Sequence, residues 1–177
     1  LIVLAYYVHV LIARHNKMIL IDGGVFTMGD TFGDGQANDK PPQKQNVQSF
    51  YLSKYEVTIG EWNKVVGKKP NPFRLISDEE PPVGDHFPMN VSWFDALIYC
   101  NKRSMKEGLT PFYTVGYDID PDNWPSQLPE YVMGVDAGSG RSTSRWRSKL
   151  DEYRIYFNPN SDGYRLPTEA EWEFAAR

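Results

Sequence analysis

Hydrophobic and polar residues alternate over short distances near the start of the chain, a pattern typical of β-strands with one buried face. Residues 18–29 form two short apolar runs divided by Gly23 and Gly24. We predict two strands joined by a tight turn, because consecutive glycines adopt turn conformations without steric cost. A second alternating stretch, 47–57, predicts a further, partly buried strand that carries Phe50 and Tyr55.

Three later segments begin in the same way, with a hydroxyl residue followed three positions later by a carboxylate. They are Thr58-Ile-Gly-Glu61, Ser92-Trp-Phe-Asp95 and Thr168-Glu-Ala-Glu171. A hydroxyl at the N-cap and a carboxylate at N3 satisfy two backbone N–H groups, so each segment predicts a helix start. The second helix is expected to end near Lys106, because Gly108 is a natural residue just beyond a helix. Trp93 and Trp172 lie in first turns and are expected to cover large apolar areas.

The segments between these elements are irregular. Residues 68–90 carry five prolines and predict an extended surface connection, and in residues 114–162 the regular signals fade. Three short helices among short strands and much loop predict the α+β class. We therefore expect one domain over residues 18–177, with an inserted loop at about 114–162.

Residues 1–17 precede this domain as a largely apolar arm. Residues 1–13 are apolar except for His9, but thirteen residues are too few to cross a bilayer, which needs about 20. Two interpretations stay open: a clipped signal or anchor, or read-through upstream of a start at Met18. We expect no stable membrane span, and both a cytoplasmic and an exported location remain open.

Composition and charge narrow the classes of partner. The 177 residues carry 14% aromatic side chains, enough to build a core, and a net charge of −4. An acidic chain has no overall field that recruits nucleic acid or anionic lipid. We therefore expect a folded domain that binds no nucleic acid.

Cys100 is the single cysteine of the sequence, which excludes disulfides within the chain and any cysteine-rich metal cluster. It lies at helical spacing from Trp93, Ala96 and Leu97, on one apolar stripe of the second predicted helix. No histidine or lysine lies within a turn on that face to lower its pKa. We interpret Cys100 as a buried core thiol.

Candidate metal ligands are sparse. The histidines His9, His15 and His86 form no short metal-binding spacing. Two acidic stretches match the calcium loop of an EF-hand only in part. The first contains Asp30, Asp34 and Gly35, and the second contains Asp118, Asp120 and Asp122. We interpret both as solvated acidic turns, with calcium as the alternative, and predict no catalytic, cofactor-binding or metal-binding residue in the chain.

One basic stretch could contact an anionic ligand by charge and by stacking. It contains Arg141, Arg145, Trp146, Arg147 and Lys149, beside Asp151 and Glu152. In a chain of net negative charge, we interpret this stretch as a solvated loop.

Four phrases of the sequence carry a family resemblance. They are 21–30 (IDGGVFTMGD), 50–58 (FYLSKYEVT), 90–96 (NVSWFDA) and 163–177 (GYRLPTEAEWEFAAR), and the last is the most specific. Together they closely resemble the formylglycine-generating enzyme family, also called sulfatase-modifying factors. Residues 99–102 and 107–113 resemble the bacterial branch of that family. The resemblance covers about residues 18–113 and 163–177.

The resemblance implies a variant of the C-type lectin fold: twisted antiparallel strands, a few short helices and much irregular chain. It implies that full-length relatives oxidise a sulfatase cysteine to formylglycine, with oxygen, copper and a pair of active-site cysteines, and that they bind calcium. These cysteines and calcium loops lie beyond the phrase that ends at Arg177, so no family catalytic residue maps onto the chain.

Two functional hypotheses follow from the resemblance. One is the N-terminal part of a formylglycine-generating domain, inactive alone and expected to need no cofactor, whose full-length parent has a sulfatase or another protein or peptide as its partner. The other is a non-catalytic ligand-binding module on the same scaffold.

Overall fold

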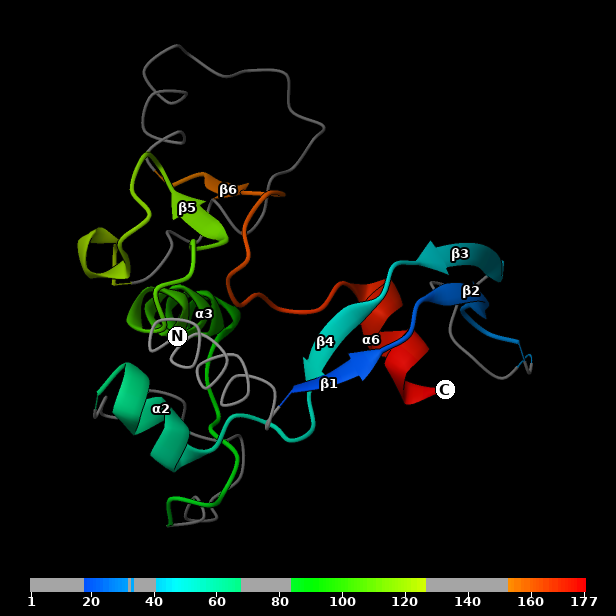
Figure 1. Ribbon diagram of the computed structural model, residues 1–177, viewed down its shortest axis with the longest axis horizontal. Helices are drawn as coiled ribbons and strands as arrows, with labels where there is room; N and C mark the ends of the chain where they lie inside the picture. The colour runs from blue at the N-terminus through cyan, green and yellow to red at the C-terminus, as the bar shows by residue number, and fades with distance from the viewer. Residues whose placement is uncertain (1–17, 32, 34–40, 68–83, 127–152) are drawn as a thin grey trace, which may run out of the picture. The chain divides into compact units, whose positions relative to one another are not determined.

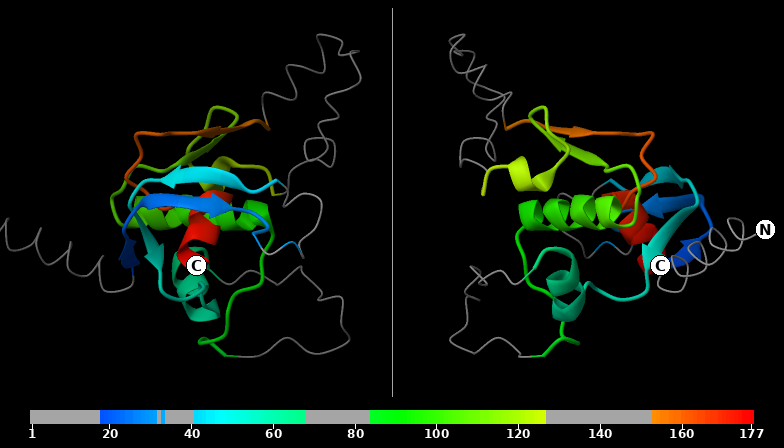
Figure 2. Two further views of the ribbon diagram at one scale, coloured as in Figure 1. Left: turned by 90° about the vertical axis from the view of Figure 1, so that its right-hand side faces the viewer. Right: turned by 60° about the vertical axis from the view of Figure 1, so that its left-hand side comes forward.

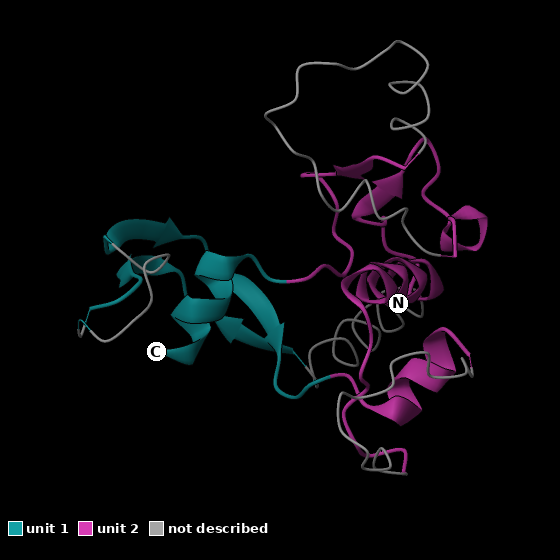
Figure 3. Ribbon diagram, turned by 180° about the vertical axis from the view of Figure 1, so that it is seen from behind, with its two compact units in different colours: residues 1–56, 167–177 teal, residues 57–166 magenta. Residues whose placement is uncertain are grey.

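The computed structural model describes residues 18–31, 33, 41–67, 84–126 and 153–177 (Figure 1). The described chain forms two compact units, coloured separately in Figure 3. Unit 1 consists of residues 1–56 and 167–177, and unit 2 of residues 57–166. The predicted arm at 1–17 lies outside the described residues, and so does the centre of the predicted insertion, residues 127–152.

Unit 1 is built from four short strands and one helix. The strands are β1 (Met18–Ile21), β2 (Gly24–Met28), β3 (Gln43–Val47) and β4 (Phe50–Ser53), and the helix is α6 (Glu169–Ala176). β1 pairs antiparallel with β4, and β2 pairs antiparallel with β3. The strand predicted over 47–57 is therefore split and ends earlier, and Tyr55 lies beyond it, 72% exposed.

Gly23 and Gly24 do not form a turn between paired strands, which corrects the prediction. Ile21 pairs with Phe50 and Gly24 pairs with Val47, so the register is the same on both sides of the interruption. A Cβ at Gly23 would lie 2.4 Å from the Val47 carbonyl oxygen. Gly23 is thus needed because the opposite backbone approaches closely, and its N–H donates to Ser49 Oγ at 3.0 Å.

α6 packs on the β2–β3 ribbon. The Phe174 ring lies 3.5 Å from the position of a Cβ on Gly24 and stacks edge-to-face on Phe26 at 5.3 Å between centroids. The Gly29 N–H donates to Glu173 Oε1 at 2.9 Å, and this bond lowers the pKa of that carboxyl. Trp172, expected to be covered, is 65% exposed, because Phe174 is the aromatic residue that faces the strands.

Unit 2 surrounds one long helix. Its elements are α2 (Ile59–Val65), α3 (Trp93–Lys106), β5 (Tyr113–Val115), the 3₁₀ turn η2 (Pro121–Asn123) and β6 (Ile155–Phe157). β5 and β6 pair antiparallel, and both lie in the sequence range where regular signals fade. α3 lies between α2 and the β5–β6 ribbon (Figure 2). The core combines α3 side chains with Tyr113, Val115 and Trp124.

All three predicted helix starts are confirmed. Thr58 and Thr168 each form a reciprocal capping box with the glutamate three residues on. Ser92 Oγ accepts the Asp95 N–H at 3.1 Å, but it also donates to Asp95 Oδ2 at 2.7 Å, so the shorter carboxylate bonds the cap hydroxyl. α3 ends at Lys106, and Gly108 has φ +69°, as its position after the helix predicts.

The buried stripe of α3 is rotated by one residue from the predicted one. Phe94, Leu97, Ile98 and Cys100 are buried, whereas Trp93 is 51% exposed. Counting the stripe from Phe94 rather than Trp93 also brings Asn101 into the core. In the part of the chain that the structure describes, no helix is long and apolar enough to cross a membrane.

Candidate functional site

Cys100 lies in the core of unit 2, which confirms the predicted buried thiol. It is 7% exposed on α3, and burial raises its pKa to about 12. Its backbone carbonyl accepts a hydrogen bond from Ser104 Oγ at 2.7 Å. Because only the thiolate is a good nucleophile or metal ligand, this thiol is chemically quiet at neutral pH.

Asn101, next to Cys100, is the polar centre of unit 2 and is fully buried. Its Nδ2 donates to the carbonyl oxygens of Tyr113, at 2.7 Å, and Ile119, at 2.9 Å. Its Oδ1 accepts the Tyr113 N–H at 3.1 Å. One side chain thus joins α3 to β5 and to the acidic turn. The sequence-based prediction did not include Asn101 in the core. Starting the helical stripe at Phe94 instead of Trp93 would have included it.

Ser104 performs a similar task one turn later. Its Oγ accepts the Tyr164 N–H at 2.8 Å, while Gly163 packs so closely that a Cβ there would lie 2.6 Å from that oxygen. Tyr113 Oη accepts the Leu166 N–H at 3.0 Å. The residues 163–166 of the most family-specific phrase are therefore bound to α3 and β5, and their role here is structural.

A half-buried ionic and aromatic cluster extends along α3. The Arg103 guanidinium lies 4.1 Å from the centroid of the Tyr164 ring and donates to Glu107 at 3.1 Å. Tyr164 Oη donates to Glu107 at 2.7 Å. Burial raises the pKa of Tyr164 to about 12, and the same cause raises that of Tyr113 to about 12. Both phenols stay protonated at neutral pH and act as hydrogen-bond partners.

The acidic turn at Asp118 uses its carboxylates to fold itself. Asp118 Oδ1 accepts the Asp120 N–H at 2.8 Å, and Asp120 Oδ1 accepts the Asp122 N–H at 3.0 Å. Asn123 Nδ2 donates to Asp118 Oδ2 at 2.8 Å, and Lys102 pairs with Asp122. These side-chain bonds are the local contacts by which Asp and Asn residues stabilise a turn.

Most of the other candidate residues fall outside the part of the chain that the structure describes. His9, His15, Asp34, Gly35 and the basic stretch at 141–149 lie outside the described residues. Asp30 Oδ1 accepts the Gly33 N–H at 2.5 Å, and His86 stacks on Phe87 at 4.3 Å between ring centroids. Within the described ranges, no three His, Cys, Asp or Glu side chains are placed to share a metal ion.

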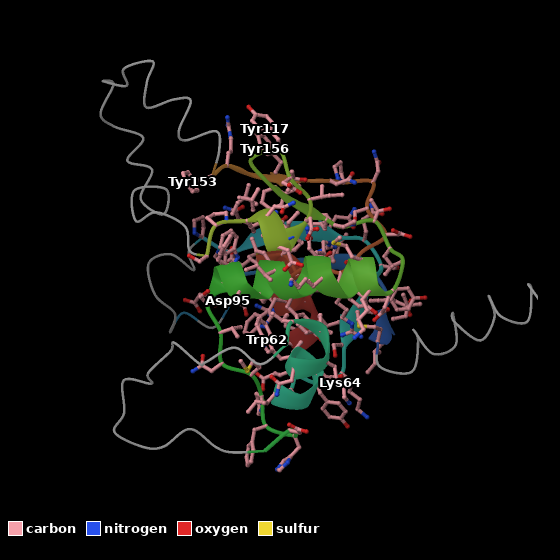
Figure 4. The ribbon with its side chains drawn as sticks, turned by 90° about the vertical axis from the view of Figure 1, so that its left-hand side faces the viewer. Trp62, Lys64, Asp95, Tyr117, Tyr153 and Tyr156 are labelled. Carbon is pink, nitrogen blue, oxygen red and sulfur yellow. The ribbon has the colours of Figure 1, made fainter. Side chains whose placement is uncertain are left out.

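Figure 4 shows how the remaining labelled side chains of unit 2 are distributed. Trp62, on α2, is 1% exposed and stacks on Tyr99 at 5.4 Å between ring centroids. Tyr117 and Tyr156 lie at the opposite side of the unit, on the turn after β5 and on β6, and are 87% and 40% exposed. In unit 2, burial raises the pKa of the Cys100 thiol and of the Tyr113 and Tyr164 phenols, so these three groups stay protonated at neutral pH.

Comparison with known proteins places this scaffold. Residues 11–177 match the family described as sulfatase-modifying factor enzyme 1-like domain. The chain is 34% identical over 163 residues to the chaperone protein LppX of Paenibacillus barcinonensis, covering 91% of this chain and 45% of LppX. It is 27% identical to the inactive C-alpha-formylglycine-generating enzyme 2 of Mus musculus, covering 93% of this chain and 48% of that protein. It is 29% identical to the formylglycine-generating enzyme of Bos taurus, covering 91% and 39%.

Solved structures agree on the fold. Treponema denticola variable protein 1 superposes with a TM-score of 0.58 at 28% identity, over 90% of this chain and 51% of that one. CarF superposes with a TM-score of 0.56 at 27% identity, over 90% and 56%. The expected fold, α+β of the formylglycine-generating-enzyme type, is confirmed. The chain spans less than half the length of the three named relatives.

Proposed function

Because the chain belongs to the family of sulfatase-modifying factor enzyme 1-like domains, we propose that these 177 residues supply the N-terminal scaffold of such a domain and not its oxidation chemistry. In this proposal the full-length parent acts on a polypeptide such as a sulfatase. The residues described above hold the fold in the shape on which that activity depends.

The observation that carries this proposal is the state of the single thiol. The family resemblance implies an oxidation that needs two cysteines close together, one of which engages copper and the substrate cysteine. This chain has only Cys100, which is buried and has its pKa raised to about 12. A soft copper(I) ion prefers thiolate ligands, and a protonated thiol inside a helix stripe offers it none.

The relatives also support a separation between the region that builds the fold and the residues that carry the chemistry. A formylglycine-generating enzyme and an inactive homologue of one match this chain at nearly equal identity, 29% and 27%. Similarity over these residues therefore does not distinguish an active relative from an inactive one. This is expected if the region builds the fold and the chemistry depends on other residues.

The direct test is a peptide conversion assay. The chain is incubated with a peptide that carries a sulfatase-type cysteine motif, with copper and reductant, and the peptide is analysed by mass spectrometry. We expect no conversion and no tight binding of copper(I). A product lighter by the change from thiol to aldehyde, absent with Cys100→Ala, would show that Cys100 is catalytic and would disprove the proposal.

A second candidate function is protein binding without catalysis. It is favoured by one finding, the 34% identity to a protein named as a chaperone. Its test is the aggregation of a chemically denatured enzyme, followed by light scattering with and without equimolar chain. Suppression that is abolished by heating the chain beforehand would favour this function, whereas unchanged scattering would count against it.

A further inference from the structure

The β5–β6 ribbon of unit 2 has two outer edges, and the hydrogen bonds at its ends show which backbone groups face them. The Gly116 N–H donates to the Arg154 carbonyl at 2.7 Å, and the Asn158 N–H donates to the Phe112 carbonyl at 2.8 Å. In an antiparallel pair, residues that bond the partner strand alternate with residues whose backbone groups point away from it. The first and third residues of each strand therefore direct their N–H and carbonyl groups outward.

The outer edge of β5 is closed by contacts within unit 2. The Tyr113 N–H and carbonyl bond the Asn101 side chain at 3.1 Å and 2.7 Å. Val115 exchanges two backbone hydrogen bonds with Asp118, at 3.0 Å and 3.1 Å. Both outward-facing residues of β5 thus have partners, and no further strand can pair with this edge.

The outer edge of β6 is open. The outward N–H and carbonyl groups of Ile155 and Phe157 have no hydrogen-bond partner among the residues that the structure describes. Proteins usually protect such an edge with a charged residue, a proline or a bulge, but β6 consists of Ile155, Tyr156 and Phe157. The unused groups have the spacing of a strand, so their natural partner is the backbone of another extended polypeptide.

Aromatic side chains flank this edge on both faces of the ribbon. Phe157 lies opposite Tyr113 on the face that packs on α3, and it is 59% exposed. Tyr156 points to the other face, where the Arg154 guanidinium lies 5.7 Å from its ring centroid, and it is 40% exposed. A strand added beside β6 would place its alternate side chains against these two rings, which favours apolar residues in that strand.

The charge of the adjoining turn favours the same class of partner. Residues 117–122 contain three aspartates and no basic residue, and Lys102 and Arg154 offset only part of this charge. Tyr117 of this turn and Tyr156 of β6 lie at the same side of unit 2 (Figure 4). A negative charge here attracts a polypeptide with basic residues beside its apolar stretch and repels nucleic acid and anionic lipid.

We propose that the outer edge of β6 binds an extended segment of an unfolded polypeptide as an added strand. The proposal rests on the second candidate function, protein binding without catalysis, and names the surface and the conformation of the bound chain. Main-chain hydrogen bonds to Ile155 and Phe157 supply affinity. The exposed rings of Tyr156 and Phe157 select apolar side chains at alternate positions.

The first test compares two peptides on the unchanged protein. The probe is a fluorescent peptide in which Val and Thr alternate between terminal lysines, and its binding to the 177-residue chain is followed by fluorescence anisotropy. The matched peptide has the same side chains, but the backbone nitrogens of its Val-Thr segment are methylated and cannot donate. We expect the methylated peptide to bind at least tenfold more weakly, because it cannot pair with the edge.

The second test changes the edge itself. Phe157→Pro removes an N–H that points away from β5, so it leaves the β5–β6 bonds in place, and proline is tolerated at such edge positions. Phe157→Ala removes the same ring but keeps the N–H, which makes it the matched control. We expect Phe157→Pro to bind the unmethylated peptide about tenfold more weakly than Phe157→Ala. Slow alkylation of Cys100 in both variants verifies that unit 2 is folded.

Three results would overturn the proposal. The first is equal affinity for the methylated and unmethylated peptides, which is decisive even if Phe157→Pro does not fold. The second is equal binding by the two folded variants. The third is a dimer of the chain, measured by light scattering, that Phe157→Pro dissociates, because the edge would then pair with a second copy. Suppression of aggregation that persists in Phe157→Pro would leave the protein-binding function intact and refute only this surface.

Discussion

The two units of this protein differ in how much of their structure is buried. Unit 2 has a core in which Leu97, Asn101 and Ser104 are fully buried, and the two polar side chains bind β5, the acidic turn and Tyr164. Unit 1 is a thin layer of strands and one helix, with large apolar side chains such as Trp172 at its surface. We therefore expect unit 2 to be the more stable of the two units.

The two units also differ in where their polar side chains form hydrogen bonds. In unit 2 the buried hydrogen bonds of Asn101 and Ser104 fix which strand and which turn pack on α3, so they specify one arrangement. In unit 1 the polar contacts are at element ends, such as the Glu173 bond to Gly29 and the cap at Thr168. Changes in unit 2 should therefore have larger effects than changes in unit 1.

The largest expected effect is the protection of Cys100. With its pKa raised to about 12, the native thiol is ionised about a thousandfold less at pH 8 than the thiol of the unfolded chain. Alkylation of the native protein should be slower by at least this factor. Its rate should keep rising with pH above 10, where the rate in denaturant has levelled off. Rapid labelling of the native chain, followed by mass spectrometry, would contradict a closed core.

The next effect concerns Asn101→Leu. This change removes two buried hydrogen bonds and one partly buried one, and it leaves the Tyr113 and Ile119 backbone groups without those partners. We expect a loss of about 3 kcal/mol in the free energy of unfolding, measured by urea denaturation. Asn123→Leu, at an exposed position of the same turn, is the control. Equal losses in both variants would mean that burial of the amide is not the cause.

A smaller effect is expected from Gly163→Ala. The new Cβ would lie 2.2 Å from the Thr110 carbonyl oxygen and 2.6 Å from Ser104 Oγ, so the 163–166 segment must move away from α3. Overpacking of this kind costs about 2 kcal/mol. Thermal unfolding followed by circular dichroism measures it, with Gly24→Ala, where the nearest atom would lie 3.5 Å away, as a comparison. An unchanged melting temperature for Gly163→Ala would show that the segment is loosely held.

The smallest effect should come from unit 1, with Thr168→Ala. The change removes the N-cap bond to the Glu171 N–H at 3.2 Å and should cost about 1 kcal/mol, while Thr168→Ser should cost little. The measurement is urea denaturation, with labelling of Cys100 in parallel. If Thr168→Ala also exposes Cys100 to the reagent, the two units unfold as one and the comparison between them fails.

The helices were predictable because their information is local. A hydroxyl and a carboxylate three residues apart favour a helix start, and each of the three pairs on which a helix was predicted does begin one. The exposure of Trp93 and Trp172 was not predictable in this way, because burial depends on which face meets another element. A rotation of one residue around α3 moved Trp93 out of the core and brought Asn101 into it.

The positions of two strands were predictable from the sequence, but their pairing partners were not, because pairing depends on residues far away in the chain. The apolar runs at 18–21 and 24–28 identify strands, but their partners lie between 15 and 35 residues later. β5 and β6 carry three residues each, too few to give a periodic signal, and they pair across the gap that contains residues 127–152. Likewise the acidic turn resembled a calcium loop in sequence, and only the direction of its N–H donors shows how its oxygens are used.

The uninterrupted register across Gly23 has a consequence for how this sequence can change in length. β1 and β2 follow one another on one side of the ribbon, and β3 and β4 follow on the other, so a single alignment governs all four strands. Adding one residue at the interruption would turn β1 over relative to β4 and exchange its two faces. Adding residues between Met28 and Gln43 only lengthens the connection, and the cost of closing it rises slowly with length. Insertions and deletions among homologues should therefore accumulate between β2 and β3 and be rare at Gly23.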